Sequence, residues 1–135
     1  MATPKILIAD SDPELIPILA LHLRNEEYEV ICAGEGEMAI AAARNERPDL
    51  LVVNVAMPVG ERRNIHDFLS DDPELLSIPV IYLVAGRNAP GASAPKLPAQ
   101  SMIRKPVPTR ELLRKIAAAL GGPEAADADQ QKYAA

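Results

Sequence analysis

The sequence predicts an α/β domain in which helices flank a parallel sheet. Short apolar runs alternate along the chain with segments whose apolar side chains have helical spacing. Strands that alternate with helices form βαβ units, which make the strands parallel and the crossovers right-handed. The run Leu50–Val53 is continuously apolar, as expected of a strand buried on both faces of the sheet. Asn54 follows it, at the carboxyl end of the strand, where open α/β sheets bind their ligands.

The remaining elements follow from the same patterns. We expect strands at Lys5–Ala9, Tyr28–Ala33, Pro79–Ala85 and Ser101–Arg104. Helices are expected from about Pro13 to Leu23, at Glu37–Asn45, around Ile65–Leu69 and at Thr109–Leu120.

The helix boundaries follow from capping residues and prolines. Asp12 or Ser11 is the expected N-cap of the first helix. Pro17 lies inside that helix, removes a backbone hydrogen bond and predicts a local bend. The sequence Asp71-Asp72-Pro73 ends the third helix.

The fourth crossover breaks the regular alternation. The segment from Gly86 to Ser101 contains Pro90, Pro95 and Pro98, so we expect its helix to be short or irregular. The folded domain is expected to cover residues 1–122. Residues 123–135 are polar and Ala-rich and are predicted to be a mobile tail or a linker remnant.

Length and composition limit the classes of function. The 135 residues predict one domain, and its core must be aliphatic because the chain contains one Phe, three Tyr and no Trp. The net charge of −5 argues against nucleic-acid binding by this domain. No apolar run is long enough to span a membrane, and we expect a cytoplasmic protein. The single cysteine, Cys32, lies in an apolar run and is expected to be a buried, unreactive thiol.

Four motifs resemble the receiver domain of bacterial two-component response regulators. They are I-L-I-A-D (6–10), D-L-L-V-V-N-V-A-M-P (49–58), I-P-V-I-Y-L-V-A (78–85) and K-P (105–106), and the similarity covers Lys5 to about Leu120. It implies a flavodoxin-like (βα)5 fold with the strand order 2-1-3-4-5 and a cis peptide bond between Lys105 and Pro106. It also implies phosphorelay chemistry, in which a histidine kinase transfers a phosphoryl group to an aspartate with the help of Mg²⁺.

The chain departs from this family at the positions that carry the chemistry. Asn54 occupies the phosphoacceptor position, and a neutral amide is a poor nucleophile that cannot form the acyl phosphate. Ser11 replaces the second carboxylate of the family's acidic pair, which leaves Asp10 alone. Since Mg²⁺ prefers charged oxygen ligands, we expect no metal and no other cofactor.

The positions that couple the family's site to a distant surface have also changed. Val84 replaces a Ser or Thr hydroxyl, and Met102 replaces the aromatic switch residue. Arg62 replaces a glycine that is usual in the loop after the third strand. Lys105, the family's phosphoryl-contacting lysine, persists beside Asp10, and we expect the two to form an ion pair across the strand ends. An engineered change of aspartate to asparagine at position 54 could silence a normal receiver, but it would not explain Ser11, Val84 and Met102.

The residues therefore predict a pseudo-receiver for signal transduction. It would be a protein-interaction module that works without phosphorylation and is not an enzyme, with its binding surface around residues 86–101 and the last helix. The partner would be a protein, and a homodimer is one form that the interaction could take. Two alternatives remain open: a working phosphoryl-accepting receiver, and a receiver-like domain that senses a small molecule in the vacated pocket. Asp49 is at the wrong end of its strand to replace the phosphoacceptor.

Overall fold

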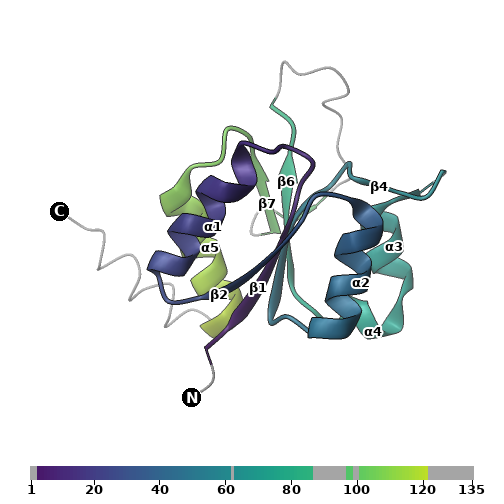
Figure 1. The fold of residues 1–135 in the computed structure, drawn as a ribbon, viewed down its shortest axis with the longest axis horizontal. Helices are drawn as coiled ribbons and strands as arrows, with labels where there is room; N and C mark the ends of the chain where they lie inside the picture. The colour runs from purple at the N-terminus through teal and green to yellow at the C-terminus, as the bar shows by residue number, and fades with distance from the viewer. Residues whose placement is uncertain (1–2, 62, 87–96, 99–100, 122–135) are drawn as a thin grey trace.

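Five parallel strands form the central sheet of the computed structural model, which describes residues 3–61, 63–86, 97–98 and 101–121 (Figure 1). The strand order is β2-β1-β3-β6-β7. Counted within this sheet alone, the order is the predicted 2-1-3-4-5, so the flavodoxin-like architecture is confirmed. The strands are β1 (Lys5–Ala9), β2 (Glu29–Ala33), β3 (Leu50–Asn54), β6 (Val80–Val84) and β7 (Met102–Arg104).

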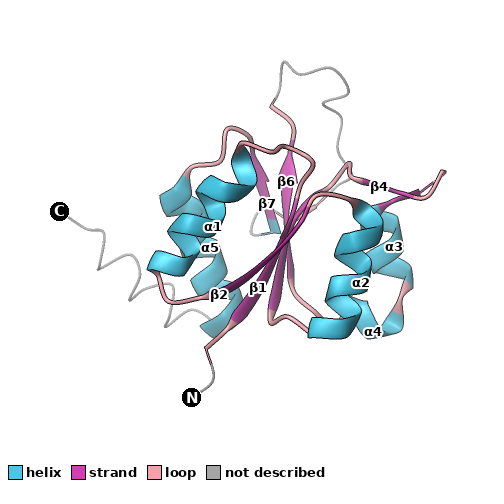
Figure 2. Ribbon diagram, in the orientation of Figure 1, coloured by secondary structure: helices cyan, strands magenta, loops and turns pink. Residues whose placement is uncertain are grey.

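Helices cover both faces of the sheet (Figures 1 and 2). α1 (Leu15–Asn25) and α5 (Thr109–Gly121) pack on one face. α2 (Gly36–Glu46), α3 (Ile65–Asp71) and α4 (Pro73–Leu76) pack on the other. Alternate side chains of each strand enter the two apolar layers, which is why the central strands read as continuous apolar runs.

α1 begins at Leu15, later than the sequence predicts. The N-cap is Glu14, which makes no side-chain capping hydrogen bond, so the prediction of Asp12 or Ser11 is wrong. The Asp12 carboxylate, two residues earlier, accepts hydrogen bonds from the backbone N–H groups of Glu14 (2.9 Å) and Leu15 (3.4 Å).

The later start places Pro17 in the first turn. The Ile16 N–H in the same turn donates to the Asp12 carbonyl oxygen at 3.5 Å, so backbone acceptors do precede this turn. The loss of a hydrogen bond and the local bend at Pro17 stay predictions.

The segment after β3 contains a hairpin that the sequence did not predict. β4 (Pro58–Val59) and β5 (Arg63–Asn64) pair antiparallel, and Gly60 in the connecting turn has a φ of 71°. Glycine adopts this left-handed conformation without steric cost. The hairpin leads directly into α3, whose first turn is capped by the Asn64 side chain, which accepts a hydrogen bond from the Asp67 N–H at 2.9 Å.

α3 ends at Asp71, as predicted, but the chain then forms one further short helix, α4. Asp72 caps it by accepting a hydrogen bond from the Glu74 N–H at 2.9 Å, and Pro73 occupies the first helical position. Proline is favoured there because the N–H that it lacks would have no partner. The same Asp-Pro pair thus ends one helix and begins the next.

The prediction that Cys32 is buried is wrong. Cys32 is exposed because β2 is an edge strand of the sheet and is only partly covered. Partial burial still raises the pKa of its thiol, and this effect exceeds the opposite one of the nearby Arg24 guanidinium. A raised pKa lowers the fraction of reactive thiolate, so exposure alone does not make this cysteine a nucleophile.

Several predictions fall outside the described residues. They concern Arg62, the tail at 123–135 and most of the fourth crossover, namely residues 87–96 and 99–100. Within the part of the chain that the structure describes, no helix has the length and apolar character needed to cross a membrane.

Candidate functional site

Three polar side chains meet at the carboxyl end of the sheet. Asp10 follows β1, Asn54 ends β3 and Lys105 follows β7. The Lys105 Nζ atom lies 2.7 Å from Asp10 Oδ2, and Asn54 Nδ2 donates a hydrogen bond to Asp10 Oδ1 at 3.4 Å. Parallel strands end at the same edge of the sheet, which is why residues so far apart in sequence come together. The expected ion pair is present, and the Lys105–Pro106 peptide bond is cis.

Asp10 is the buried member of this cluster. Its side chain is 1% exposed, whereas that of Lys105 is 25% exposed. Its Oδ1 also accepts a hydrogen bond from the backbone N–H of Asp12 at 3.0 Å. A buried carboxylate is costly unless it is paired with a cation and hydrogen-bonded. The partners of Asp10 meet both conditions and leave the pair close to neutral.

Asn54 uses both ends of its amide within the cluster. Its Oδ1 accepts a hydrogen bond from the Ala56 N–H at 3.0 Å, while its Nδ2 donates to Asp10. A carboxylate at this position could not donate, and it would place a second negative charge beside Asp10. The asparagine is therefore suited to an intact Asp10–Lys105 pair.

The two residues predicted to stand at the switch positions, Val84 and Met102, pack among apolar side chains. Val84 is 1% exposed and lies in the same apolar cluster as Val53 and Val55. Met102 is half-buried against that cluster and stands opposite Tyr82 in the register of β6 and β7. Neither side chain offers a hydrogen-bond donor to an anion at the strand ends. Ser11, which is predicted to replace the second carboxylate of the acidic pair, is exposed.

The residues present do not fit the Mg²⁺ that the receiver resemblance implies. Mg²⁺ takes oxygen ligands in near-octahedral geometry, usually including one or two carboxylates. Asp10 supplies a single carboxylate whose charge Lys105 already balances, and Asn54 supplies a neutral amide. Among the residues that the structure describes, no group of three or more His, Cys, Asp or Glu side chains is placed to hold a metal ion.

Sequence reasoning missed the contacts that hold the hairpin against α2. A Cβ atom at Gly36 would lie 2.0 Å from the carbonyl oxygen of Pro58, so only glycine allows the two backbones to come this close. The neighbouring Glu37 accepts a hydrogen bond from the Gly60 N–H at 2.8 Å, and this bond lowers the pKa of the Glu37 carboxyl. Gly36, at the start of α2, was the only feature of the sequence that could have indicated this close contact.

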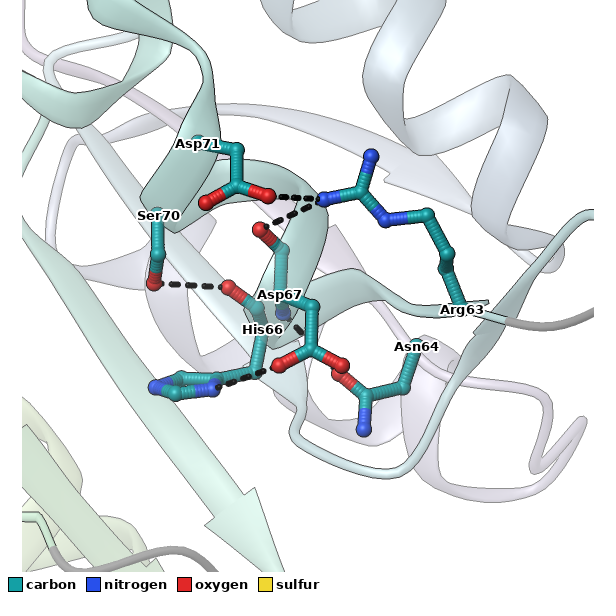
Figure 3. Close-up of polar contacts among 6 residues, drawn as sticks. All are labelled: Arg63, Asn64, His66, Asp67, Ser70 and Asp71. Carbon is teal, nitrogen blue, oxygen red and sulfur yellow. Dashed lines mark hydrogen bonds and ion pairs between the residues drawn. The ribbon is translucent and has the colours of Figure 1, made fainter.

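Arg63 holds the other side of the hairpin to α3. Figure 3 shows its guanidinium pointing toward Asp71, with which it forms an ion pair, and it donates to the Asp67 carbonyl oxygen at 3.1 Å. It also lies 5.2 Å from the centroid of the Phe68 ring, and Arg44 of α2 lies 5.5 Å from the same centroid. The segment that follows Asn54 is thus attached to both α2 and α3.

Tyr82 is a further buried group that the sequence did not single out. It is 7% exposed, and its ring packs edge-on against that of His66 with a centroid separation of 5.2 Å. Burial raises the pKa of Tyr82 to about 12, with a smaller contribution from the Asp67 carboxylate. Tyr82 is the partner of Met102, a predicted switch position, in the register of β6 and β7.

A family model for the response regulator receiver domain matches residues 6–117. The chain belongs to this family. Receiver domains are signalling modules of two-component systems that interact with proteins such as kinases and effectors.

Curated relatives share the family but are longer. "Response regulator GtcR" of Aneurinibacillus migulanus is 34% identical over 116 residues, which are 85% of this chain and 47% of the relative. "Probable transcriptional regulatory protein TcrX" of Mycobacterium tuberculosis is 37% identical over 81 residues, 59% of this chain and 33% of the relative. The chain thus spans half or less of the length of these relatives.

Solved structures have the same fold. A putative response regulator from Chloroflexus aurantiacus matches with a TM-score of 0.70 and 25% identity, over 88% of this chain and 98% of that one. The chemotaxis response regulator CheY4 of Vibrio cholerae matches with a TM-score of 0.69 and 22% identity, over 88% of this chain and 100% of that one.

Proposed function

We propose that this domain is a pseudo-receiver, a receiver fold that acts as a protein-interaction module in signal transduction without being phosphorylated. The observation that carries the proposal is the ion pair between Asp10 and Lys105, completed by the hydrogen bond that Asn54 donates. In this arrangement the charges that would attract a metal ion and a phosphoryl group instead neutralise each other.

The chemistry of phosphoryl transfer supports this proposal. Catalysis of this reaction rests on positioning and on charge neutralisation by metal ions and cationic side chains around an activated nucleophile. Asn54 is not a nucleophile, and the carboxylate that remains is paired with the one lysine of the cluster. Asp12, which also lies near the strand ends, accepts hydrogen bonds from the backbone N–H groups of Glu14 and Leu15.

We assign the partner-binding role to α5 and the crossover that precedes β7, with a protein as the partner and the cytoplasm as the location. The support comes from family membership, because receiver domains work through contacts with other proteins. A working phosphoryl-accepting receiver is the competing function, and the same experiment separates the two.

The experiment is an intact-mass measurement after incubation with acetyl phosphate and Mg²⁺. We expect the wild-type domain to gain no phosphoryl group. The double variant Ser11→Asp/Asn54→Asp should gain one, because it restores the nucleophile and the second metal carboxylate. Asn25→Asp, an exposed change at the end of α1, is the matched control and should stay unmodified. Phosphorylation of the wild-type domain would refute the proposal and support the working receiver.

A further inference from the structure

A mainly apolar pocket of about 270 Å³ opens at the amino end of β6, beside the second half of α5. Its walls come mainly from Pro79, Val80, Ala118 and Ala119. It lies at the other end of β6 from Val84, so it is separate from the cluster of Asp10, Asn54 and Lys105 at the carboxyl ends of the strands. Since a cavity of about 150 Å³ can hold a benzene molecule, this pocket has room for one ring with a small substituent.

Two polar residues interrupt the apolar lining of this pocket. They are Ser101, which precedes β7, and Lys115 of α5, whose side chain is only 15% exposed. The Lys115 Nζ atom lies 3.9 Å from Glu111 Oε1, a distance longer than that of a hydrogen bond. An ammonium group carries three donors, so this ion pair does not prevent it from binding a second anion. Of the described residues that line the pocket, Lys115 is the only one with a charged side chain.

We propose that this pocket binds a small monocarboxylic acid with an apolar body, in its ionised form. The apolar body lies against the walls, where it is removed from water. The carboxylate accepts a hydrogen bond from the Lys115 ammonium, and the Ser101 hydroxyl is a second donor in the lining. The inference does not rest on the proposed function, because none of these residues belongs to the cluster at the strand ends.

The lining favours a carboxylate over two other classes of ligand. A neutral ligand that displaced water from the pocket would leave the Lys115 ammonium less hydrated without balancing its charge, which is unfavourable. A phosphate ester carries close to two negative charges at neutral pH, and the described lining residues offer a single cation to balance them. A monocarboxylate matches both the single cation and the apolar walls.

Titration of the ¹⁵N-labelled protein with benzoate, followed by amide NMR spectra, tests the proposal. Benzamide serves as a neutral ligand of the same size. We expect benzoate to shift the amides of Val80, Ser101 and Ala118 until they saturate. Benzoate should bind about tenfold more tightly than benzamide, because a hydrogen bond between charged groups is stronger than one to a neutral amide.

Two substitutions separate the charge of the pocket from its apolar walls. Lys115→Met removes the ammonium and keeps an apolar side chain, so it should weaken benzoate binding about tenfold and leave benzamide binding unchanged. Ala119→Leu adds bulk at an exposed position of the lining, so it should weaken the binding of both ligands.

Matched controls are Arg114→Met, which removes an exposed cation of α5 outside the lining, and Ala41→Leu, which enlarges an exposed alanine of α2. Both should bind benzoate as the wild-type protein does. The proposal would be overturned by any of three results: amides at the pocket that do not shift saturably with benzoate, equal affinities for benzoate and benzamide, or a Lys115→Met variant that binds benzoate as tightly as wild type.

Discussion

Asp10 and Lys105 depend on each other within the cluster at the strand ends. The carboxylate is almost fully buried, and Lys105 is the cation that contacts its Oδ2 atom. Removing one member of such a pair leaves an uncompensated buried charge, whereas removing both leaves only the loss of a partly exposed ion pair. The effects of replacing Asp10 and Lys105 on the free energy of unfolding should therefore not be additive.

Lys105→Met should lower the free energy of unfolding by about 3 kcal/mol, because Asp10 is left buried without its cation. Adding Asp10→Asn should restore much of this loss, since no buried charge then remains. Urea denaturation of the two single variants and the double variant gives the coupling energy as a double-mutant cycle. Additive effects of the two substitutions would show that the ion pair does not hold this pocket together.

Tyr82 provides a pH test of the packing between β6 and α3. Its folded-state pKa, raised to about 12, lies above the ordinary value of 10.0 because its phenol is buried. The folded state thus disfavours the phenolate. The stability contributed by the neutral phenol is fully present below the unfolded-state pKa and is lost as pH rises from there through the folded-state pKa.

Absorbance titration of the tyrosines should therefore show one group that ionises well above the others, and Tyr82→Phe should remove it. The same substitution should reduce the loss of stability at alkaline pH. A Tyr82 phenol that titrates in the ordinary range would mean that β6 and α3 pack less closely than the edge-on contact with His66 indicates.

Among the secondary-structure elements, the hairpin of β4 and β5 departs most from the prediction. Each of its strands has two residues, which is too short for any periodic pattern, and its position depends on contacts that are distant in sequence. The long elements could be predicted because apolar side chains repeat along them with the period of a strand or a helix. Cys32 was misjudged for a related reason: an apolar run does not reveal which strand lies at the edge of the sheet.

Gly36→Ala should destabilise the domain by about 1–3 kcal/mol, because the new methyl group would overlap the Pro58 carbonyl and force the hairpin away from α2. Gly34→Ala is the matched control, since no atom lies within 4 Å of a Cβ at Gly34. Thermal or urea unfolding of both variants makes the comparison. Equal effects of the two substitutions would show that the close approach of α2 and β4 is not needed.

For the molecule as a whole, strand topology made part of the site predictable. The positions of Asp10, Asn54 and Lys105 followed once the strands were known to be parallel and their order was implied by the family. Which atoms contact one another did not follow, because that depends on side-chain orientation. The attachment of the hairpin to α2 and α3 could not be predicted either, since Arg44, Arg63 and Phe68 come from three different elements.

In a receiver that has lost its switch residues, a phosphoryl group should change the structure only near the residue that carries it. A ligand shifts a conformational equilibrium only by interacting differently with its two states. Val84 cannot hydrogen-bond a phosphoryl oxygen, and it is packed within an apolar cluster together with Tyr82 and Met102. We therefore expect that even a chemically repaired site would not reach α5.

The decisive measurement is a comparison of amide NMR spectra of Ser11→Asp/Asn54→Asp with and without beryllofluoride, a mimic of the phosphoryl group. We expect beryllofluoride to bind and to shift only the amides near residues 10, 54 and 105. Large shifts that extend to Met102 and along α5 would contradict this expectation, because they would show that the switch survives and that the domain is a dormant receiver.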